Sequence, residues 1–489
     1  MAAGVALCFD ERSRMRRGVV IGGSPLVFLR LSARGAQLVH SWRAGTRVGP
    51  SAAEGALAAR LVDTGVAYPL VGAPGSGPGR DDVDVVIPVR DQPRGLAVTV
   101  ASLGPVGGLV VVDDGSADPA AAAANAGPGA RVLRHPQSRG PAAARNRGWR
   151  AATRPLIAFI DADCVAPPDW LEGLLPLFCD PRVAAVAPRI APRVAPGTPA
   201  ALGVYDRLNF PLDMGPRPGP VRPRSWVPYV PTACVIVRRA CLEAANGFDE
   251  QLRAGEDVDL VWRLAAAGWA LRYEPAVTVT HPVRATRRAW AAQRFSYGRS
   301  AADLAARHGD AVAPLQVSPW SATAWSAGAL IHPLLGAVVA GASAVAVTRG
   351  RAAVPAGELL RAAASGHVRS GSAVARVLGR EWWPFALAAA GVSRRVRRAW
   401  ALALLAPPLA GWVRRRPPID PLRWCALAVA DGACYGAGVW AGCLRRGSID
   451  ALRPRWSRAE RADHAPPGKP RWRTASPPRF LGGHPGTPT

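Results

Sequence analysis

The sequence is almost free of lysine. Lys469 is the only lysine among 61 basic residues, so arginine carries nearly all of the positive charge. The formal net charge of +27 favours an anionic partner, such as nucleic acid, a membrane surface or a phosphorylated substrate. Because the arginines are spread along the chain rather than gathered in one basic segment, nucleic acid is the least favoured of the three.

The chain also lacks the cysteine patterns of zinc and disulfide proteins. Its eight cysteines include no C-x-x-C pair, which argues against a zinc site. We find neither a disulfide framework nor the pattern of a secretory signal peptide. A reducing, cytoplasmic setting fits these absences. With 489 residues, the chain is long enough for two or three domains.

Residues 1–72 are expected to form a small separate domain. The stretch GVVIGGSPLVFLRL (18–31) predicts two short strands around a Gly-Gly-Ser-Pro turn. Ser32 is a candidate N-cap, and the S-x-x-E spacing of Ser51 and Glu54 is typical of a capping box. Two strands, two helices and a final strand indicate a winged-helix-like unit. A Gly- and Pro-rich linker follows at residues 72–80.

Residues 80–310 are expected to form an α/β domain around a largely parallel sheet, because strand and helix patterns alternate there. The predicted strands are VDVVIPV (83–89), LVVVDDGSAD (109–118), ARVLRH (130–135) and LIAFIDAD (156–163). Ligands of open α/β sheets bind beyond the carboxyl ends of the strands. Four carboxylates lie at such ends: Asp113, Asp114, Asp161 and Asp163.

The triplet Asp161-Ala162-Asp163 ends a buried strand in two carboxylates. In an extended chain, this spacing places both side chains on the same side. A divalent metal bound between them would relieve their repulsion. For an isolated D-x-D triplet, a surface turn is the favoured explanation. The metal site becomes the better interpretation because the triplet follows a strand and other acidic motifs accompany it.

Residues 311–445 are expected to form a hydrophobic, membrane-associated helical region. Residues 311–348 contain no charged side chain, and their length is sufficient to span a bilayer, interrupted at His332-Pro333. The arginine clusters 394–398 and 414–416 flank further apolar stretches, as cytoplasmic positive clusters do. An alanine-rich soluble helical domain is the alternative. Residues 446–489, rich in Pro, Arg and Gly, are expected to be disordered.

An ordered set of motifs resembles the family 2 glycosyltransferases, which have the GT-A fold. The matching segments are VVIPVR (85–90), VVVDDGSAD (110–118), RGPAAARNRGWRAA (139–152), FIDADC (159–164), GFDEQLRAGEDVDLVWRL (247–264) and His281. They cover roughly residues 82–300. The resemblance implies a GT-A catalytic domain that binds a nucleotide sugar with a divalent metal, Mg²⁺ or Mn²⁺.

The resemblance also implies roles for individual residues on the donor side. The metal ligands would be Asp163, Asp161 and His281, with Asp161 also able to reach the ribose or to act through water. Base and ribose contacts would come from Pro88, Val89, Asp113 and Asp114. Arg139 and Arg145 would hold the diphosphate or orient their loop, although a solvated helix face accounts for them equally well.

Asp257 is the proposed general base, and Glu256 is the fallback. Direct displacement at the anomeric carbon requires a base that takes the acceptor proton from the face opposite the leaving group. Asp257 would lie in the first turn of a helix, where an anionic side chain is favoured. The alternative is that the EDVD sequence (256–259) serves only to cap this helix.

The N-terminal unit resembles the PqqD-like peptide-recognition domains, in which a leader peptide adds a strand to a sheet edge. A winged helix could instead bind DNA, but neither predicted helix has a dense basic face. The three regions together resemble the glycosyltransferase family of mycofactocin biosynthesis. This implies β-linked transfer of glucose from UDP-glucose to a peptide-derived redox cofactor or its precursor, at the cytoplasmic face of the membrane. The alternative is a membrane glycosyltransferase with a polysaccharide or lipid-linked acceptor.

Overall fold

The computed structural model describes residues 1, 3–70, 77–349 and 354–457. Most of the linker expected at residues 72–80, and the tail from residue 458, lie outside the described residues. The N-terminal elements are β1 (Ala6–Phe9), β2 (Arg14–Arg16), β3 (Val19–Gly22), β4 (Val27–Arg30), α1 (Ala33–Arg43), α2 (Ala52–Asp63) and β5 (Ala67–Leu70). The strands pair as β1–β5 and as β2–β3–β4, both antiparallel. The predicted order is confirmed, with β1 and β2 as additional strands.

Both predicted caps start their helices. The Ser32 hydroxyl accepts from a backbone N–H of α1, and the Ser51 hydroxyl accepts from the backbone N–H of Glu54 at 3.2 Å. The reciprocal bond of a capping box is absent, because the Glu54 carboxylate accepts from the N–H of Gly49 instead, at 2.8 Å. Val39 and Trp42 of α1 are buried in the core of this domain, as the helical periodicity predicts.

The central sheet has eight strands in the order β11-β13-β10-β12-β9-β6-β7-β8. The pairs β6–β7, β7–β8 and β6–β9 are parallel, whereas β12 is antiparallel to both β9 and β10. Their bounds are β6 (Val83–Val89), β7 (Gly108–Asp114), β8 (Arg131–His135), β9 (Leu156–Ile160), β10 (Val183–Arg193), β11 (Gly219–Pro220), β12 (Cys234–Arg238) and β13 (Ala270–Pro282). All four strands predicted between residues 83 and 163 are confirmed, with shorter carboxyl ends at residues 114 and 160.

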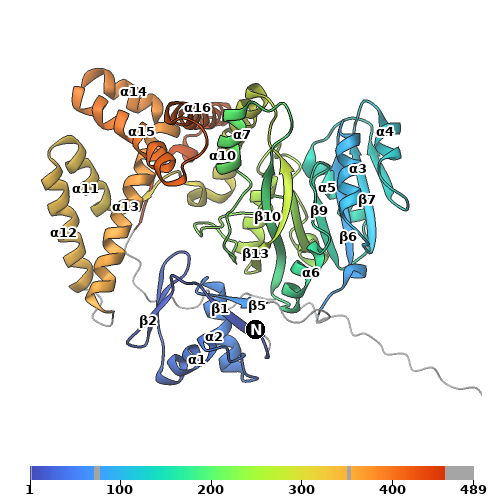
Figure 1. The fold of residues 1–489 in the computed structure, drawn as a ribbon, viewed down its shortest axis with the longest axis horizontal. Helices are drawn as coiled ribbons and strands as arrows, with labels where there is room; N and C mark the ends of the chain where they lie inside the picture. The colour runs from blue at the N-terminus through green and yellow to red at the C-terminus, as the bar shows by residue number, and fades with distance from the viewer. Residues whose placement is uncertain (2, 71–76, 350–353, 458–489) are drawn as a thin grey trace, which may run out of the picture. The chain divides into compact units, whose positions relative to one another are not determined.

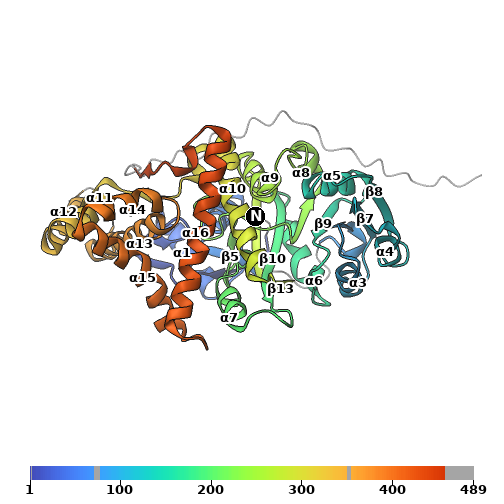
Figure 2. The same cartoon turned by 90° about the horizontal axis from the view of Figure 1, so that it is seen from above.

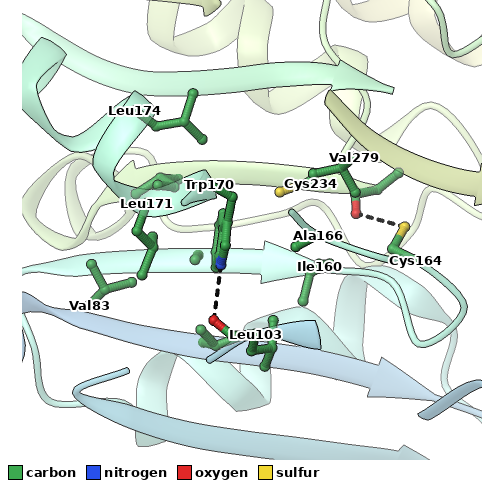
Figure 3. Close-up of a cluster of buried hydrophobic side chains, with 14 of the residues drawn as sticks. Val83, Leu103, Ile160, Cys164, Ala166, Trp170, Leu171, Leu174, Cys234 and Val279 are labelled. Atoms are coloured by element: carbon green, nitrogen blue, oxygen red, sulfur yellow. Dashed lines mark hydrogen bonds between the residues drawn. The ribbon is translucent and has the colours of Figure 1, made fainter. Parts of the chain in front are cut away.

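Helices cover both faces of this sheet (Figure 1). They are α3 (Pro93–Ser102), α4 (Pro119–Ala124), α5 (Pro141–Ala151), α6 (Trp170–Leu174), α7 (Ala200–Leu208), α8 (Arg239–Ala244) and α9 (Glu256–Ala266). Alternate residues of β6 belong to two different cores: Val85 packs with residues of α3 and α6, and Val86 packs with residues of α5 and α9. In the first core, the Trp170 indole N–H donates to the Leu103 carbonyl at 3.2 Å (Figure 3). The strands are therefore anchored on both faces, which fixes the positions of their carboxyl ends.

Beyond the sheet, the chain is helical. The elements are α10 (Arg287–His308), β14 (Gln316–Val317), α11 (Pro319–Leu330), α12 (Pro333–Arg349), α13 (Ala356–Arg380), α14 (Trp383–Val392), α15 (Arg394–Arg415), α16 (Pro421–Arg446) and β15 (Arg455–Trp456). The expected interruption at His332-Pro333 is confirmed, because α11 ends before it and α12 begins at Pro333. Strand β15 pairs with β14, which corrects the expectation that disorder begins at residue 446.

Helices α10 and α16 pack backbone against backbone (Figure 2). At Gly298 of α10, and at Gly438 and Gly442 of α16, an added Cβ would clash with a backbone carbonyl of the facing helix. The three glycines form a close-packed contact, which we call the glycine seam. A buried ion-pair network accompanies it: the Arg294 guanidinium of α10 pairs with Asp206 of α7, and it donates to Asp431 of α16 at 2.9 Å.

Among the described residues, one helix, α16, is long and apolar enough to cross a membrane. Length and composition alone are weak evidence, since the core helix of a soluble protein passes the same test. The glycine seam and the paired Asp431 show that one face of α16 packs on α10. The exposed large apolar side chains nevertheless concentrate between residues 320 and 456.

Candidate active site

A cavity of about 3520 Å³ lies at the carboxyl ends of the central strands and continues along the C-terminal helices. Most of the predicted site residues line it: Pro88, Val89, Asp114, Arg145, Asp161, Asp163, Glu256, Asp257 and His281. Two do not. Asp113 is buried beneath the surface of the cavity, and the Arg139 side chain is largely exposed and pairs with Glu250 at 3.1 Å. The structure therefore brings together residues that are up to 193 positions apart in the sequence.

Asp163 and His281 form the pair best suited to hold a metal. His281 is the penultimate residue of β13, and its Nε2 lies 3.4 Å from Oδ1 of Asp163. The His281 Nδ1 lies 2.9 Å from the Pro282 carbonyl, which can only accept, so Nε2 is the ring nitrogen that faces Asp163 and can bind a cation in the neutral ring. Oδ1 of Asp163 is buried without a hydrogen-bond partner in the described chain. Two lone-pair donors that face each other suit a divalent cation, so these residues fit the implied metal.

The charge environment of Asp163 favours a cation as well. Burial raises the pKa of Asp163, and the nearby charge of Asp161 raises it further, while His281 opposes the shift. Cys164 lies beside this pair, but its thiol donates to the Ala233 carbonyl at 3.3 Å, and burial raises its pKa well above the ordinary value. A protonated thiol is a poor ligand for a hard cation, so the carboxylate and the imidazole are the relevant donors.

Arg145 lies between the two acidic motifs. Its guanidinium donates to Oδ1 of Asp161 at 2.7 Å and to Oε1 of Glu256 at 2.8 Å. Burial lowers the pKa of Arg145, but the two carboxylates outweigh burial and raise it overall. Arg145 therefore aligns Asp161 and Glu256 through fixed ion pairs. Asp161 is engaged with Arg145 and lies outside the close Asp163–His281 group, so its predicted role as a metal ligand stays a prediction.

Asp257 occupies the first turn of α9, after Gly255 in the left-handed conformation with φ of 82°. One carboxylate oxygen accepts from the Val258 N–H at 2.8 Å, and the side chain lines the cavity. Burial, followed by the charge of Glu256, raises the pKa of Asp257 to about 7. A carboxylate with this pKa can accept a proton near neutral pH. Glu256 is 7% exposed and is already paired with Arg145, so Asp257 is the better base of the two.

Asp113 and Asp114, the two acids of the DDGS sequence (113–116), form hydrogen bonds with the loops around the cavity. Asp114 accepts from the backbone N–H groups of Arg139 and Gly140 at 2.9 and 2.8 Å, and from the Ser138 hydroxyl at 2.7 Å. Burial would raise the pKa of Asp114, but these bonds and the contact with His135 lower it overall. Asp113 accepts from Arg134 at 2.9 Å. Both acids thus set the shape of the cavity, and their direct contact with a nucleotide stays a prediction.

Two residues of the cavity were missed by the sequence reasoning. Arg284 follows His281 by three positions, and its positive charge acts on Asp163. It forms no hydrogen bond or ion pair with the rest of the described chain, so its guanidinium is free for an anion. Tyr229 lines the cavity close to Asp257, whose charge adds to burial in raising the pKa of the phenol. A basic residue three positions after the predicted metal-binding His281 could have been found from the sequence, whereas Tyr229 lies in no motif.

Comparisons with known proteins agree with this geometry. A family model described as "Glycosyl transferase family 2" matches residues 84–240. A protein of Mycobacterium tuberculosis named "Pre-mycofactocin glycosyltransferase" is 41% identical over 467 residues, which cover 92% of this chain and 97% of that protein. The chain belongs to the family 2 glycosyltransferases. The match to the relative includes the N-terminal and C-terminal regions of this glycosyltransferase, since it extends far beyond the catalytic domain.

More distant similarities cover less of the glycosyltransferase. The "Succinoglycan biosynthesis protein ExoU" of Rhizobium meliloti is 34% identical over 206 residues, which cover 38% of this chain and 58% of that protein. A solved mannosyltransferase from Pyrobaculum calidifontis, in complex with GDP-Man and Mn²⁺, is 21% identical and covers 68% of this chain and 88% of its own, with a TM-score of 0.39. At that TM-score, the likeness carries no argument about this enzyme.

Proposed function

We propose that this enzyme transfers glucose from UDP-glucose to the peptide-derived redox cofactor mycofactocin or to its precursor, with inversion at the anomeric carbon. Repeated transfer would build a short β-linked oligoglucoside. The observation that carries the acceptor is the 41% identity to the "Pre-mycofactocin glycosyltransferase", because that match extends over nearly the whole of both chains. UDP-glucose as the donor rests on the resemblance of the three regions together to the glycosyltransferases of mycofactocin biosynthesis.

Inversion is supported by the positions of the acidic groups. Asp163 and His281 provide the place for the cation, and a Mg²⁺ or Mn²⁺ ion there would neutralise charge on the leaving diphosphate. Arg284 would bind the same diphosphate. Asp257, in the same cavity and with a pKa of about 7, would take the proton of the acceptor hydroxyl. Arg145 would hold Asp161 and Glu256 in place without contacting the reacting atoms.

The direct test is transfer by the purified enzyme. It would be incubated with Mn²⁺, pre-mycofactocin, and either UDP-glucose or GDP-mannose, and the products would be separated by mass. We expect successive additions of one hexose with UDP-glucose alone, and nuclear magnetic resonance should show β-anomers. Transfer from GDP-mannose alone would overturn the donor, and α-linked products would overturn inversion.

A lipid-linked or polysaccharide acceptor is the second candidate, and it is favoured by the exposed apolar side chains of the C-terminal helices.

We propose that the C-terminal helical region binds the cytoplasmic face of the membrane. No acidic residue occurs between residues 382 and 419, whereas arginine clusters lie at 394–398 and 414–416, so the charge complements anionic lipid. In a flotation assay, the enzyme should be recovered with phosphatidylglycerol vesicles. In a separate transfer assay, a hexose in the lipid extract of the reaction would favour the lipid-linked acceptor. Equal flotation with phosphatidylcholine vesicles would refute the electrostatic part.

The N-terminal domain would bind a precursor peptide. Strand β2 has a partner on one side only within its three-stranded sheet, so its other edge can accept an added strand. We expect a fluorescently labelled precursor peptide to gain anisotropy on addition of the full-length enzyme. A scrambled peptide serves as the control, and equal gains for both peptides would argue against specific recognition.

A further inference from the structure

The cavity that contains Asp257 continues to helix α13, where two arginines one helical turn apart line it. Arg376 and Arg380 belong to the cavity wall, together with aromatic side chains such as Tyr229 and Tyr435. Most of the remaining wall at this end is apolar. Two guanidinium groups in an apolar cavity are costly unless an anion or water neutralises them.

Arg380 is held rigidly but is only partly neutralised. Its guanidinium lies 3.4 Å from the centre of the Tyr435 ring, a cation–π contact. Its Nε is 3.5 Å from the Glu381 carboxylate and has no hydrogen-bond partner in the described chain. The side chain keeps 32% exposure although the residue lies inside the cavity wall. Its remaining N–H groups therefore have access to the cavity.

Arg376 has even less neutralisation. It forms no hydrogen bond or ion pair with any residue that the structure describes, and its side chain is exposed toward the cavity. Burial, followed by the positive charge of Arg380, lowers the pKa of Arg376, and only Glu381 opposes the shift. Glu381 thus acts on both guanidinium groups, and Asp431 of the same cavity wall acts on Arg380 as well. Arg376 is therefore the guanidinium of this pair that no carboxylate of the described chain contacts directly.

Tyr229 connects this end to the catalytic base. Burial raises the pKa of the phenol, Asp257 raises it further and Arg380 lowers it, so the phenol lies within electrostatic reach of both residues. Asp257, Tyr229 and the two arginines line one continuous cavity, so a molecule whose hydroxyl approaches Asp257 can extend past Tyr229 toward the arginines. We propose that Arg376 and Arg380 form an anion subsite for a carboxylate or phosphate group of the acceptor. This rests on the proposed transferase function, because it assigns the acceptor end of the same cavity.

The test measures anion binding apart from turnover. Inorganic phosphate would be titrated calorimetrically into the full-length enzyme with UDP and Mn²⁺ saturating, so that the donor site is filled. We expect the dissociation constant to rise about tenfold or more in Arg376→Gln, as the loss of a charge-assisted hydrogen bond predicts. Arg380→Lys, which keeps the charge, should lose less than Arg380→Gln. Unchanged binding in the Arg376→Gln/Arg380→Gln double variant would overturn the subsite.

Arg369→Gln is the matched control. Arg369 lies on the same helix but not on the cavity wall, and it donates to the Ser365 carbonyl at 3.2 Å. Equal losses in Arg369→Gln and Arg376→Gln would also overturn the proposal. If phosphatidylglycerol vesicles compete with inorganic phosphate for the two arginines, the anion of the acceptor is a lipid phosphate. If the vesicles do not compete, the anion belongs to a soluble acceptor. Failure of wild-type turnover of UDP-glucose, with phosphate binding intact, would overturn the proposed donor and leave the subsite standing.

Discussion

The rate of transfer should follow the ionisation of Asp257. The carboxylate must be unprotonated to accept a proton from the acceptor. With a pKa of about 7, roughly one molecule in eleven has the active form at about pH 6, and roughly ten in eleven have it at about pH 8. We therefore expect the rate to rise about tenfold across this interval. The reason is structural, because burial and the charge of Glu256 are what raise the pKa.

The pH–rate profile should have its inflection at the pKa of Asp257, and other groups around Asp257 adjust this pKa. The Val258 N–H and the Arg145 guanidinium lower the pKa, whereas Asp161 raises it. A cation bound near Asp161 would lower it further. The inflection at saturating Mn²⁺ should thus lie at or below about 7, and it should move upward when the metal concentration is reduced.

The assay is release of UDP under single-turnover conditions, with wild type and Asp257→Asn compared across the pH range. Removal of a general base costs roughly 10²–10⁴ in rate. The asparagine variant should show this loss, a flat profile and unchanged affinity for UDP-glucose. Asp257→Glu should recover part of the rate. Full turnover in the asparagine variant, or the same inflection in both proteins, would refute the assignment of the base.

Three further predictions concern the metal, the diphosphate and the helix packing. Asp163→Ala or His281→Ala should abolish the Mn²⁺ dependence of UDP binding in calorimetry, and a retained dependence would place the metal elsewhere. Arg284→Gln should weaken UDP binding about tenfold but leave UMP binding nearly unchanged, since only the former has the second phosphate; equal losses would point to misfolding. Gly438→Val should lower the free energy of unfolding by about 1–3 kcal/mol, because the new side chain would clash with a backbone carbonyl of α10. Gly366→Ala is the control: Gly366 has open space around it, so this variant should have the same stability as the wild type or a slightly higher one. Thermal unfolding measures both variants, and equal stability would contradict the close packing.

Local patterns were sufficient to predict the catalytic half of the chain. Strands follow from apolar runs bounded by acids and turn residues, and β6 is confirmed with the predicted bounds 83–89, whereas β7 ends at Asp114, before the predicted residue 118. The D-x-D spacing and His281 pointed to one metal site, and the structure brings Asp163 and His281 together. The strands are readable because they depend on neighbours in the sequence, whereas the role of His281 came from the resemblance to the family.

Features that depend on tertiary contacts were not predictable. Strand β1 has only four residues, and β2 has three, of which two are arginines, so neither strand has a periodicity to detect. The pairing of Arg145 with both Asp161 and Glu256 joins positions that are far apart. It gives Arg145 an orienting contact, while the predicted contact with the diphosphate stays a prediction. The glycine seam likewise requires knowledge of which helix faces α16.

The glycine seam makes the region after residue 310 part of the enzyme's framework rather than a removable attachment. A protein truncated at that point would lose α16, expose the glycine-lined face of α10 and leave Arg294 without one of its two carboxylates. Truncation at residue 310, where the apolar region begins, is therefore not a route to a more soluble enzyme. Any engineered minimal catalyst has to keep α16 or replace its packing face.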